Sequence, residues 1–211
     1  MDKKGILMVL SGFSGAGKGT VVKNLISKYD EYALSVSMTT RAPREGERHG
    51  VEYFFTTREE FEKTIAEEGL VEYAEYCGNY YGTPRAYVEE QLAAGKNVIL
   101  EIEIQGALKI KEKFPESLLI FITPPNATEL KRRLIGRGTE TLDVIEKRLS
   151  RASEESQGIE AYDYIVVNDD LMTCVDEVHR LVDDARREPV RCQEFIARIR
   201  EELKDFEIHA E

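Results

Sequence analysis

The chain has 211 residues, of which 42% are hydrophobic, and a formal net charge of −11. This length allows a sizeable core and fits one domain with inserted lobes better than two independent domains. The acidic balance argues against a nucleic-acid-binding surface, because such surfaces usually carry a positive charge. Any site for an anionic ligand must therefore be local.

The cysteines and histidines give no sign of a metal site. Cys77, Cys174 and Cys192 are widely spaced, and the three histidines have no partner at ligand spacing. We therefore expect reduced, structural thiols and exposed histidines. No run approaches the roughly 18 apolar residues of a membrane span, and no signal peptide is recognisable. These features predict a cytoplasmic protein without membrane partners.

A glycine-rich segment follows the apolar run Ile6–Leu10 and precedes a helical run that starts at Val21. Gly12, Gly17 and Lys18 fill the pattern G-x-x-x-x-G-K, whose backbone N–H groups close around a phosphate at a helix N-terminus. An ordinary glycine-rich turn is the alternative. The residues predicted to bind ATP in this loop are Gly12, Phe13, Ser14, Gly15, Ala16, Gly17, Lys18, Gly19 and Thr20.

The loop departs from the usual pattern at one position. The residue after the lysine, commonly a Ser or Thr that ligates magnesium, is Gly19, and Thr20 follows it. The sequence GKGT resembles the loop of adenylate kinases. The loop alone therefore indicates a nucleotide kinase without indicating for which nucleotide.

Short apolar runs alternate with helical patterns along the chain, which predicts an α/β fold with a mainly parallel sheet and helices on both faces. Ligands of such folds gather at the carboxyl ends of the strands. The predicted core strands are Ile6–Leu10, Ala33–Met38, Val98–Ile104, Leu118–Ile122 and Tyr164–Val167.

Residues 37–92 have a different character and predict an inserted lobe of strands with one short helix. Thr57 and Glu60 form a candidate capping box for that helix. Residues 78–84 are predicted to form a turn, after which Thr83 and Pro84 favour a helix start. Beyond residue 188, an apolar stripe at helical spacing predicts a helix packed on the domain, with a subunit contact as the alternative.

Taken together, the motifs resemble those of guanylate kinases. They are the phosphate-binding loop, S-x-T-T-R-x-P-R-x-G-E with its following G-x-x-Y, V-E-Y-A-E-Y-x-G-N-Y-Y-G-T, E-I-E-I-Q-G, R-R-L-x-G-R-G-T-E-T and V-N-D-D. The resemblance runs from about residue 5 to residue 185. It implies a guanylate-kinase-like domain over residues 5–187, with a core (5–36, 93–130 and 149–187), a GMP-binding lobe (37–92) and a helical lid (131–148), followed by a C-terminal extension (188–211).

Side-chain chemistry and the resemblance together indicate a GMP site. Arg41 and Arg44 lie three residues apart beside a proline, and their planar guanidinium groups suit a phosphate, although a solvated basic turn is the alternative. The carboxylate of Glu72 matches the N1–H and N2–H donors of guanine, whereas strand alternation alone would place it facing solvent. The resemblance implies this GMP-binding set: Ser37, Arg41, Arg44, Tyr53, Glu72, Tyr81, Thr83 and Glu103.

Acids and arginines complete the expected site. Glu101 and Glu103 follow a strand beside the loop, where acids commonly hold hydrated Mg²⁺, and we assign Thr20 and Glu101 to the metal, through water. Capping of the next helix is the alternative for these acids. The resemblance implies that Arg133, Arg137 and Arg148 contact the ATP phosphates or the transferring group and that Asn168 contacts adenine, with loop capping as its alternative. Arg132 is interpreted as a solvated helix charge.

These observations predict a kinase that converts ATP and GMP, and dGMP as well, to ADP and the diphosphate with Mg²⁺. Lys18, Arg41, Arg137 and Arg148 are the predicted catalytic residues. Two alternatives stay open. A kinase for another small phosphorylated acceptor would share the fold, but Glu72 with Ser37 and Thr83 argues against it. A non-catalytic scaffold would have no need of the loop around Lys18.

Overall fold

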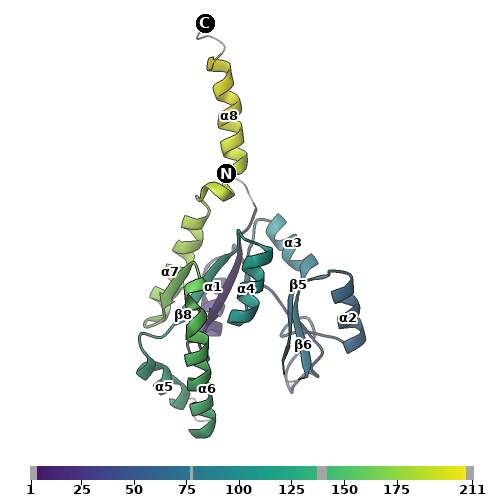
Figure 1. The fold of residues 1–211 in the computed structure, drawn as a ribbon, viewed down its shortest axis with the longest axis vertical. Helices are drawn as coiled ribbons and strands as arrows, with labels where there is room; N and C mark the ends of the chain where they lie inside the picture. Colours follow the sequence, from purple (N-terminus) through teal and green to yellow (C-terminus); the bar gives the residue numbers. More distant parts are fainter. Residues whose placement is uncertain (1–3, 77, 137–141, 208–211) are drawn as a thin grey trace.

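A computed structural model describes residues 4–76, 78–136 and 142–207 of the chain. Its centre is a five-stranded sheet in the order β2-β7-β1-β8-β9, and every neighbouring pair is parallel (Figure 1). The strands are β1 (Leu7–Gly12), β2 (Tyr32–Leu34), β7 (Asn97–Glu101), β8 (Leu118–Thr123) and β9 (Tyr164–Val167). This sheet confirms the predicted α/β fold.

Helices cover both faces of this sheet. Successive side chains of a strand point to opposite faces, so each strand contributes apolar side chains to both layers. Met8 and Leu10 of β1 pack with helices α1 (Lys18–Lys28) and α7 (Leu171–Ala185). Leu7 and Val9 pack on the other face with α3 (Arg85–Ala93) and α4 (Ile104–Lys113). Each fully buried apolar side chain of this kind contributes roughly 1.5–3 kcal/mol, so these layers stabilise the central sheet.

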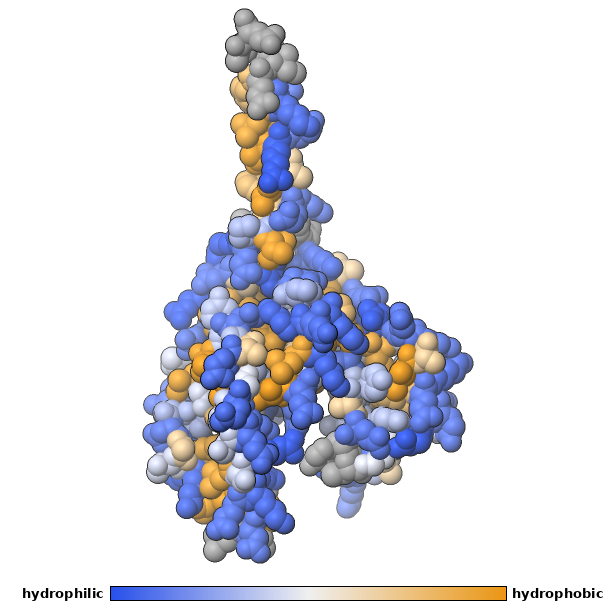
Figure 2. Space-filling view, in the orientation of Figure 1, coloured by the Kyte–Doolittle hydropathy of each residue, from blue (hydrophilic) through white to orange (hydrophobic). Residues whose placement is uncertain are grey.

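A second, four-stranded sheet in the order β4-β3-β6-β5 forms the inserted lobe. Its strands are β3 (Met38–Thr39), β4 (Phe54–Phe55), β5 (Leu70–Tyr76) and β6 (Asn79–Pro84). Helix α2 (Arg58–Ala66) covers this sheet with the fully buried Phe61, and Thr57 with Glu60 forms the predicted capping box. Figure 2 shows a deep notch between this lobe and the body of the molecule.

Three predicted element boundaries are wrong. Residues 33–38 do not form one strand, because the chain leaves the core sheet after Leu34 and enters the lobe sheet at Met38. The strand predicted to reach Ile104 ends at Glu101, since α4 begins at Ile104. Most of the predicted turn at residues 78–84 is strand β6, which pairs antiparallel with β5.

Two helices, α5 (Ala127–Gly136) and α6 (Leu142–Glu155), extend beside the carboxyl edge of the core sheet (Figure 1). Leu130, Leu134 and Ile145 form a small apolar cluster of their own, and Phe13 of the glycine-rich loop packs against it. The predicted boundary between lid and core at residues 148 and 149 falls inside α6. Through Phe13, the glycine-rich loop is in direct contact with this cluster.

Two short 3₁₀ helices, η1 (Ser156–Ala161) and η2 (Pro189–Arg191), precede β9 and α8, and α8 (Gln193–Glu207) is the last element that the structure describes. The predicted helix is present, but its packing on the domain is not: α8 extends away from the body (Figure 1). Among the described residues, no helix is long and apolar enough to cross a bilayer. Cys174 and Cys192 are free and buried, as expected, while Cys77 lies outside the described residues.

Candidate functional site

The glycine-rich loop between β1 and α1 lies at the carboxyl end of the central strand. Gly17 caps α1 with a φ of 92°, a conformation that L side chains rarely adopt, and a Cβ there would lie 2.6 Å from Nδ2 of Asn168. The Nζ of Lys18 donates to the Gly12 carbonyl at 2.6 Å. Glycine is therefore required at position 17 by both its backbone angle and its neighbour.

The side chain of Asn168 is directed at this loop. Asn168 follows β9, is buried, and donates from Nδ2 to the Ala16 carbonyl at 2.8 Å. This bond ties the last core strand to the loop. The structure thus gives Asn168 a bracing role, and its predicted contact with adenine stays a prediction.

A cavity of about 340 Å³ lies above the loop and is lined by the loop residues together with Thr20 and Glu101. A Cβ at position 19 would lie 3.7 Å from Oε1 of Glu101. The carboxylate of Glu101 thus lies close to the loop backbone at Gly19. Burial raises the pKa of Glu101, and the positive charge of Lys18 opposes this shift. A hydroxyl and a carboxylate around one cavity are oxygen donors of the kind that Mg²⁺ prefers, so the residues fit the predicted metal.

Arg133 of α5 is held against the loop and the end of β9. Its Nη2 donates to the Asn168 carbonyl at 2.8 Å, and its Nε donates to Glu129 at 2.7 Å. The guanidinium groups of Arg132 and Arg133 lower the pKa of Glu129 to about 2. The Arg132 side chain itself is 72% exposed, which agrees with its interpretation as a solvated charge.

Helix α6 places two further arginines over the site. Nη1 of Arg148 donates to the Ser14 hydroxyl at 3.3 Å, so the predicted catalytic arginine reaches the glycine-rich loop. Arg151, one turn further on, forms an ion pair with Glu103 at the N-terminus of α4. Sequence reasoning missed Arg151, although its spacing of three residues from Arg148 places it on the same helix face. Arg137 lies outside the described residues.

The lobe holds a second cationic site. Nη2 of Arg41 donates to both carboxylate oxygens of Glu47 at 2.9 Å, and the Arg44 backbone N–H donates to Glu47 at 2.8 Å. The Arg41 guanidinium lies 5.4 Å from the ring centroid of Tyr53, whose ring meets that of Tyr81 edge to face at 6.0 Å. This pairing fixes the direction of Arg41, which a solvated basic turn would not require.

Glu72 is buried between the lobe and the core. It is 6% exposed, and Thr83 donates to its Oε1 at 2.8 Å. A Cβ at Gly106 of α4 would lie 3.6 Å from its Oε2, so the carboxylate faces the first turn of that core helix. Burial raises the pKa of Glu72, and the hydrogen bond from Thr83 opposes this shift. The solvent-facing alternative is therefore wrong.

A β-bulge explains the burial of Glu72. The pairing of β5 with β6 shifts register between Leu70 and Tyr73, so both Val71 and Glu72 are buried in succession. A bulge redirects side chains and breaks strand alternation. Ser37, also predicted to contact guanine, is half-buried just before β3, and its carbonyl accepts from Phe54 N–H at 2.8 Å.

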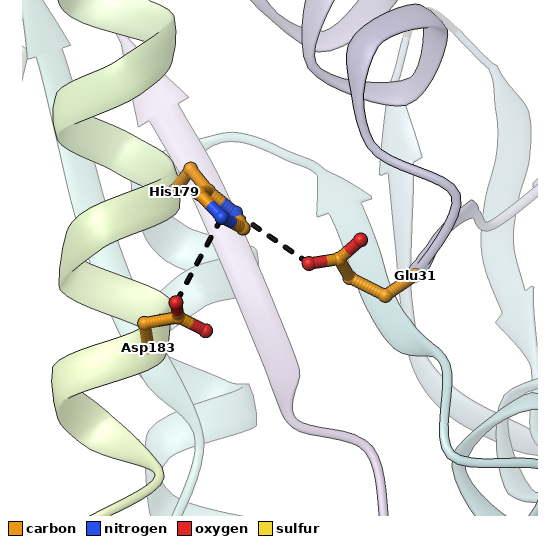
Figure 3. Close-up of side chains that lie close together, drawn as sticks. All are labelled: Glu31, His179 and Asp183. Atoms are coloured by element: carbon orange, nitrogen blue, oxygen red, sulfur yellow. Dashed lines mark ion pairs between the residues drawn. The ribbon is translucent and has the colours of Figure 1, made fainter.

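A separate cluster lies on the α1 and α7 side of the core sheet, where Glu31 and Asp183 flank His179 (Figure 3). The carboxylates lie near different ring nitrogens, 3.7 Å from Nδ1 and 3.8 Å from Nε2. The ring also stacks on Tyr29 with a centroid separation of 3.7 Å, and its side chain is only 19% exposed. The expectation that His179 is exposed is thus wrong, and the ring joins α7 to the segment before β2.

The three comparisons with known proteins agree with one another. The family profile described as Guanylate kinase matches residues 4–185. Guanylate kinase of Bacillus anthracis is 54% identical over 192 residues, covering 90% of this chain and 94% of the relative. Guanylate kinase of Bacillus subtilis (strain 168) is 53% identical over 183 residues, covering 86% and 90%.

A solved structure supports the same relationship. The crystal structure of guanylate kinase from Anaplasma phagocytophilum aligns with a TM-score of 0.72 at 34% sequence identity, covering 90% of this chain and 91% of that chain. The segment that the family profile matches includes the glycine-rich loop, the lobe around Glu72 and the arginines of α5 and α6. The chain therefore belongs to the guanylate kinase family.

Proposed function

We propose that this chain transfers the γ-phosphoryl group of ATP to GMP, and to dGMP, giving ADP and the corresponding diphosphate. The observation that carries the choice of acceptor is the buried Glu72 carboxylate with its Thr83 partner. A carboxylate accepts from both N1–H and N2–H of guanine, and the Thr83 and Ser37 hydroxyls can donate to O6. Adenine offers neither donor.

The acceptor phosphate would bind at the cationic site of the lobe. Arg41 and Arg44 supply permanent positive charge, and Tyr53 and Tyr81 supply hydroxyl donors. Glu47 holds Arg41 in place through both carboxylate oxygens. Glu103, which pairs with Arg151 at the N-terminus of α4, would add a contact to the guanine base. The acceptor would therefore be held at both its base and its phosphate.

The donor phosphates would bind at residues 12–20, where backbone N–H groups and Lys18 neutralise their charge. Arg133, Arg137 and Arg148 would add positive charge from the lid, and Asn168 would contact adenine. Thr20 and Glu101 would hold Mg²⁺ through water, and the bound ion would supply further neutralisation of the phosphates.

Catalysis would then rest on alignment and charge neutralisation. The nucleophile is a phosphate oxygen that is already ionised at neutral pH, so no general base is needed. Lys18 and Arg148, both at the glycine-rich loop, would stabilise the charge that spreads over the transferring group. Holding the two substrates in one orientation supplies a large part of the rate acceleration.

The division into a core, a GMP-binding lobe at residues 37–92 and a lid at residues 131–148 belongs to this proposal, as does a cytoplasmic location. A coupled assay of the full chain with ATP and Mg²⁺ against GMP, dGMP, AMP, CMP and UMP tests it. Turnover with the two guanine nucleotides and little with the others is expected. Comparable turnover with AMP would contradict the role of Glu72.

A further inference from the structure

The cluster of Glu31, His179 and Asp183 brings one imidazole and two carboxylates together away from the proposed nucleotide sites. Glu31 directly precedes β2, so the cluster lies at the amino edge of the core sheet, opposite the glycine-rich loop. One ring nitrogen and one oxygen of each carboxylate all lie within 4.8 Å of one another, and the three residues are half-buried. Figure 3 shows both carboxylates directed at the ring from two different elements.

The separations within the cluster exceed those of hydrogen bonds. Oδ2 of Asp183 lies 3.8 Å from Nε2 of His179, and Oε1 of Glu31 lies 3.7 Å from Nδ1, whereas a hydrogen bond between such atoms is about 2.7–3.2 Å long. Two ligands of a tetrahedral zinc ion, each about 2.1 Å from the metal, are about 3.4 Å apart. A shift of about 0.4 Å would therefore allow Asp183 and Nε2 to share one ion.

Two tyrosines fix the orientation of the His179 ring. Tyr29 stacks on the ring, and its own hydroxyl donates to Asp176 at 2.9 Å. The hydroxyl of Tyr32, a buried residue, lies 2.9 Å from Nδ1. When Nδ1 carries the proton and donates it to this hydroxyl, Nε2 presents its lone pair on the side of Asp183. Histidines that bind metals commonly use their second ring nitrogen in this way.

The ligands come from two segments of the chain. His179 and Asp183 lie four residues apart on α7, which places them on one helix face, a spacing at which two ligands reach the same ion. The expectation that His179 has no partner at ligand spacing is therefore wrong. Glu31 lies between α1 and β2, and its side chain is 40% exposed, so its carboxylate can turn toward Nε2 within solvent.

The cations around the cluster have other partners. Lys28 pairs with Asp176. Nη2 of Arg186 donates to Asn97 at 2.8 Å, and its Nε lies 3.9 Å from Oδ1 of Asp183, which is not the oxygen near the ring. With a neutral imidazole, the two carboxylates give the cluster a charge of −2. A divalent cation would balance this charge.

We propose that Glu31, Nε2 of His179 and Asp183 bind a divalent transition-metal ion of the zinc class, with water completing the coordination. An imidazole ligand favours such ions over Mg²⁺, which prefers oxygen ligands. The bound ion would join α7 to the segment between α1 and β2 and thereby stabilise the folded chain. This site is separate from the Mg²⁺ of the proposed reaction, so the two proposals can fail independently.

Calorimetric titration of the full chain with ZnCl₂, in a buffer that contains excess Mg²⁺ and does not bind zinc, tests the proposal. The wild type should bind one Zn²⁺ at this site. His179→Ala should weaken binding by about tenfold or more, and Asp183→Asn and Glu31→Gln should each weaken it as well. The controls are His49→Ala, at an exposed position in the lobe, and Asp184→Asn, which changes the exposed acid next to Asp183. Both should retain the wild-type affinity.

Thermal unfolding gives a second readout. The Tm of the wild type should rise with the concentration of ZnCl₂, because an ion that binds only the folded state stabilises it by mass action. The Tm of the His179→Ala variant should not respond in this way. Turnover of each variant with ATP and GMP in the absence of zinc verifies that it is folded.

Long-range ¹H–¹⁵N spectra of the wild type test the site without any substitution. Addition of ZnCl₂ should shift the Nε2 resonance of His179 and leave those of His49 in place. An unresponsive His179, or a zinc affinity that survives His179→Ala or Asp183→Asn, would overturn the proposal. An affinity that survives Glu31→Gln would overturn the link between α7 and the segment before β2.

Discussion

The Thr83 hydroxyl donates a 2.8 Å hydrogen bond to the Glu72 carboxylate across strands β5 and β6, in a place that water barely reaches. Only one oxygen of Glu72 is used in this bond, and the other faces the first turn of α4. A buried carboxylate with acceptor capacity to spare requires donors, and guanine supplies two. The proposed selection of the base therefore rests on the relationship between these two residues.

The first prediction concerns selection between GMP and AMP. Glu72→Ala should reduce kcat/KM for GMP by roughly 10² to 10⁴, because two hydrogen bonds to a charged group are worth about 1.5–3 kcal/mol each. The KM for ATP should change little. Steady-state kinetics on both substrates checks this, with Glu75→Ala, an exposed acid of the same strand, as the control. Wild-type kinetics in the Glu72 variant would remove the basis for guanine selection.

The second prediction concerns pH. The pKa of Glu72 is raised by burial, so in the free protein its carboxyl holds its proton at higher pH than an ordinary glutamate does. Guanine requires the ionised form. GMP affinity should therefore fall as pH is lowered through this raised pKa, and binding near it should release protons, which calorimetry in buffers of different ionisation enthalpy measures.

The same raised pKa affects stability with the opposite sign. The folded, unliganded protein binds more protons than the unfolded chain between the unfolded and folded pKa values of Glu72, so this contribution to stability falls as pH rises through that window. Glu72→Gln is the control for both measurements. This variant removes the titrating carboxyl of residue 72, whereas the ionisable groups of GMP still titrate. Identical pH profiles for the variant and the wild type would assign the effect to another group.

The third prediction concerns Lys18. Lys18→Ala should lower turnover by orders of magnitude, because the lysine is the fixed charge at the donor phosphates. GMP should still bind, since the lobe that carries Arg41 and Glu72 is a separate sheet. Turnover assays and calorimetric titration with GMP separate the two effects. Lys23→Ala, at an exposed position of α1, is the control, and equal losses in the two variants would argue against a special role of the loop lysine.

The fourth prediction concerns Arg148, whose guanidinium reaches Ser14 in the loop. An arginine that meets transition-state charge can be worth about 10³ to 10⁵ in rate. Arg148→Ala should therefore lower kcat far more than it raises the KM for GMP. Arg132→Ala, which removes an exposed guanidinium one helix away, should have little effect. If Arg132 proved the costlier of the two, the position of the lid arginines would need revision.

The fifth prediction concerns Glu47 as a positioning residue for Arg41. Glu47→Ala should raise the KM for GMP about tenfold or more with little change in the KM for ATP, because Arg41 loses the partner that fixes its direction. Glu47→Asp should recover part of the loss. Glu52→Ala removes a similar side-chain bond to the backbone of the same loop, from Arg48, and is the control. Equal effects of both variants would indicate loop stability alone.

Much of the fold could be predicted from the sequence, because long apolar runs and glycines at fixed spacing report directly on buried strands and on the loop. The end of β7 could not be predicted, because the residues after it are also apolar. Ile102 and Ile104 do not continue the strand but pack against the core cluster around α4. Strand β6 was not predicted, because it contains an asparagine and a glycine, which are residue types common in turns.

The site shows the same limit at Glu72. Alternation places it toward solvent, and only the bulge between Leu70 and Tyr73, a feature of pairing with β6, buries it. The ion pair of Arg151 with Glu103 joins residues far apart in the chain, so no local pattern could reveal it. The exposed face of α8 has the spacing of a buried one, because sequence periodicity records that a face is apolar and not which molecule covers it.

The central position of β1 has a consequence for the order in which the chain folds. Leu7 pairs with Val98 and Met8 with Leu118, so the strand that leads into the glycine-rich loop has no partner until a long stretch of the chain has been gathered. Closing such long loops costs entropy before any contact is gained, which makes this pairing slow. The β5–β6 hairpin, by contrast, joins residues as close as Tyr76 and Asn79. We expect the hairpin that carries Glu72 and Thr83 to form early in refolding, and the capacity to bind ATP to appear only with the last kinetic phase.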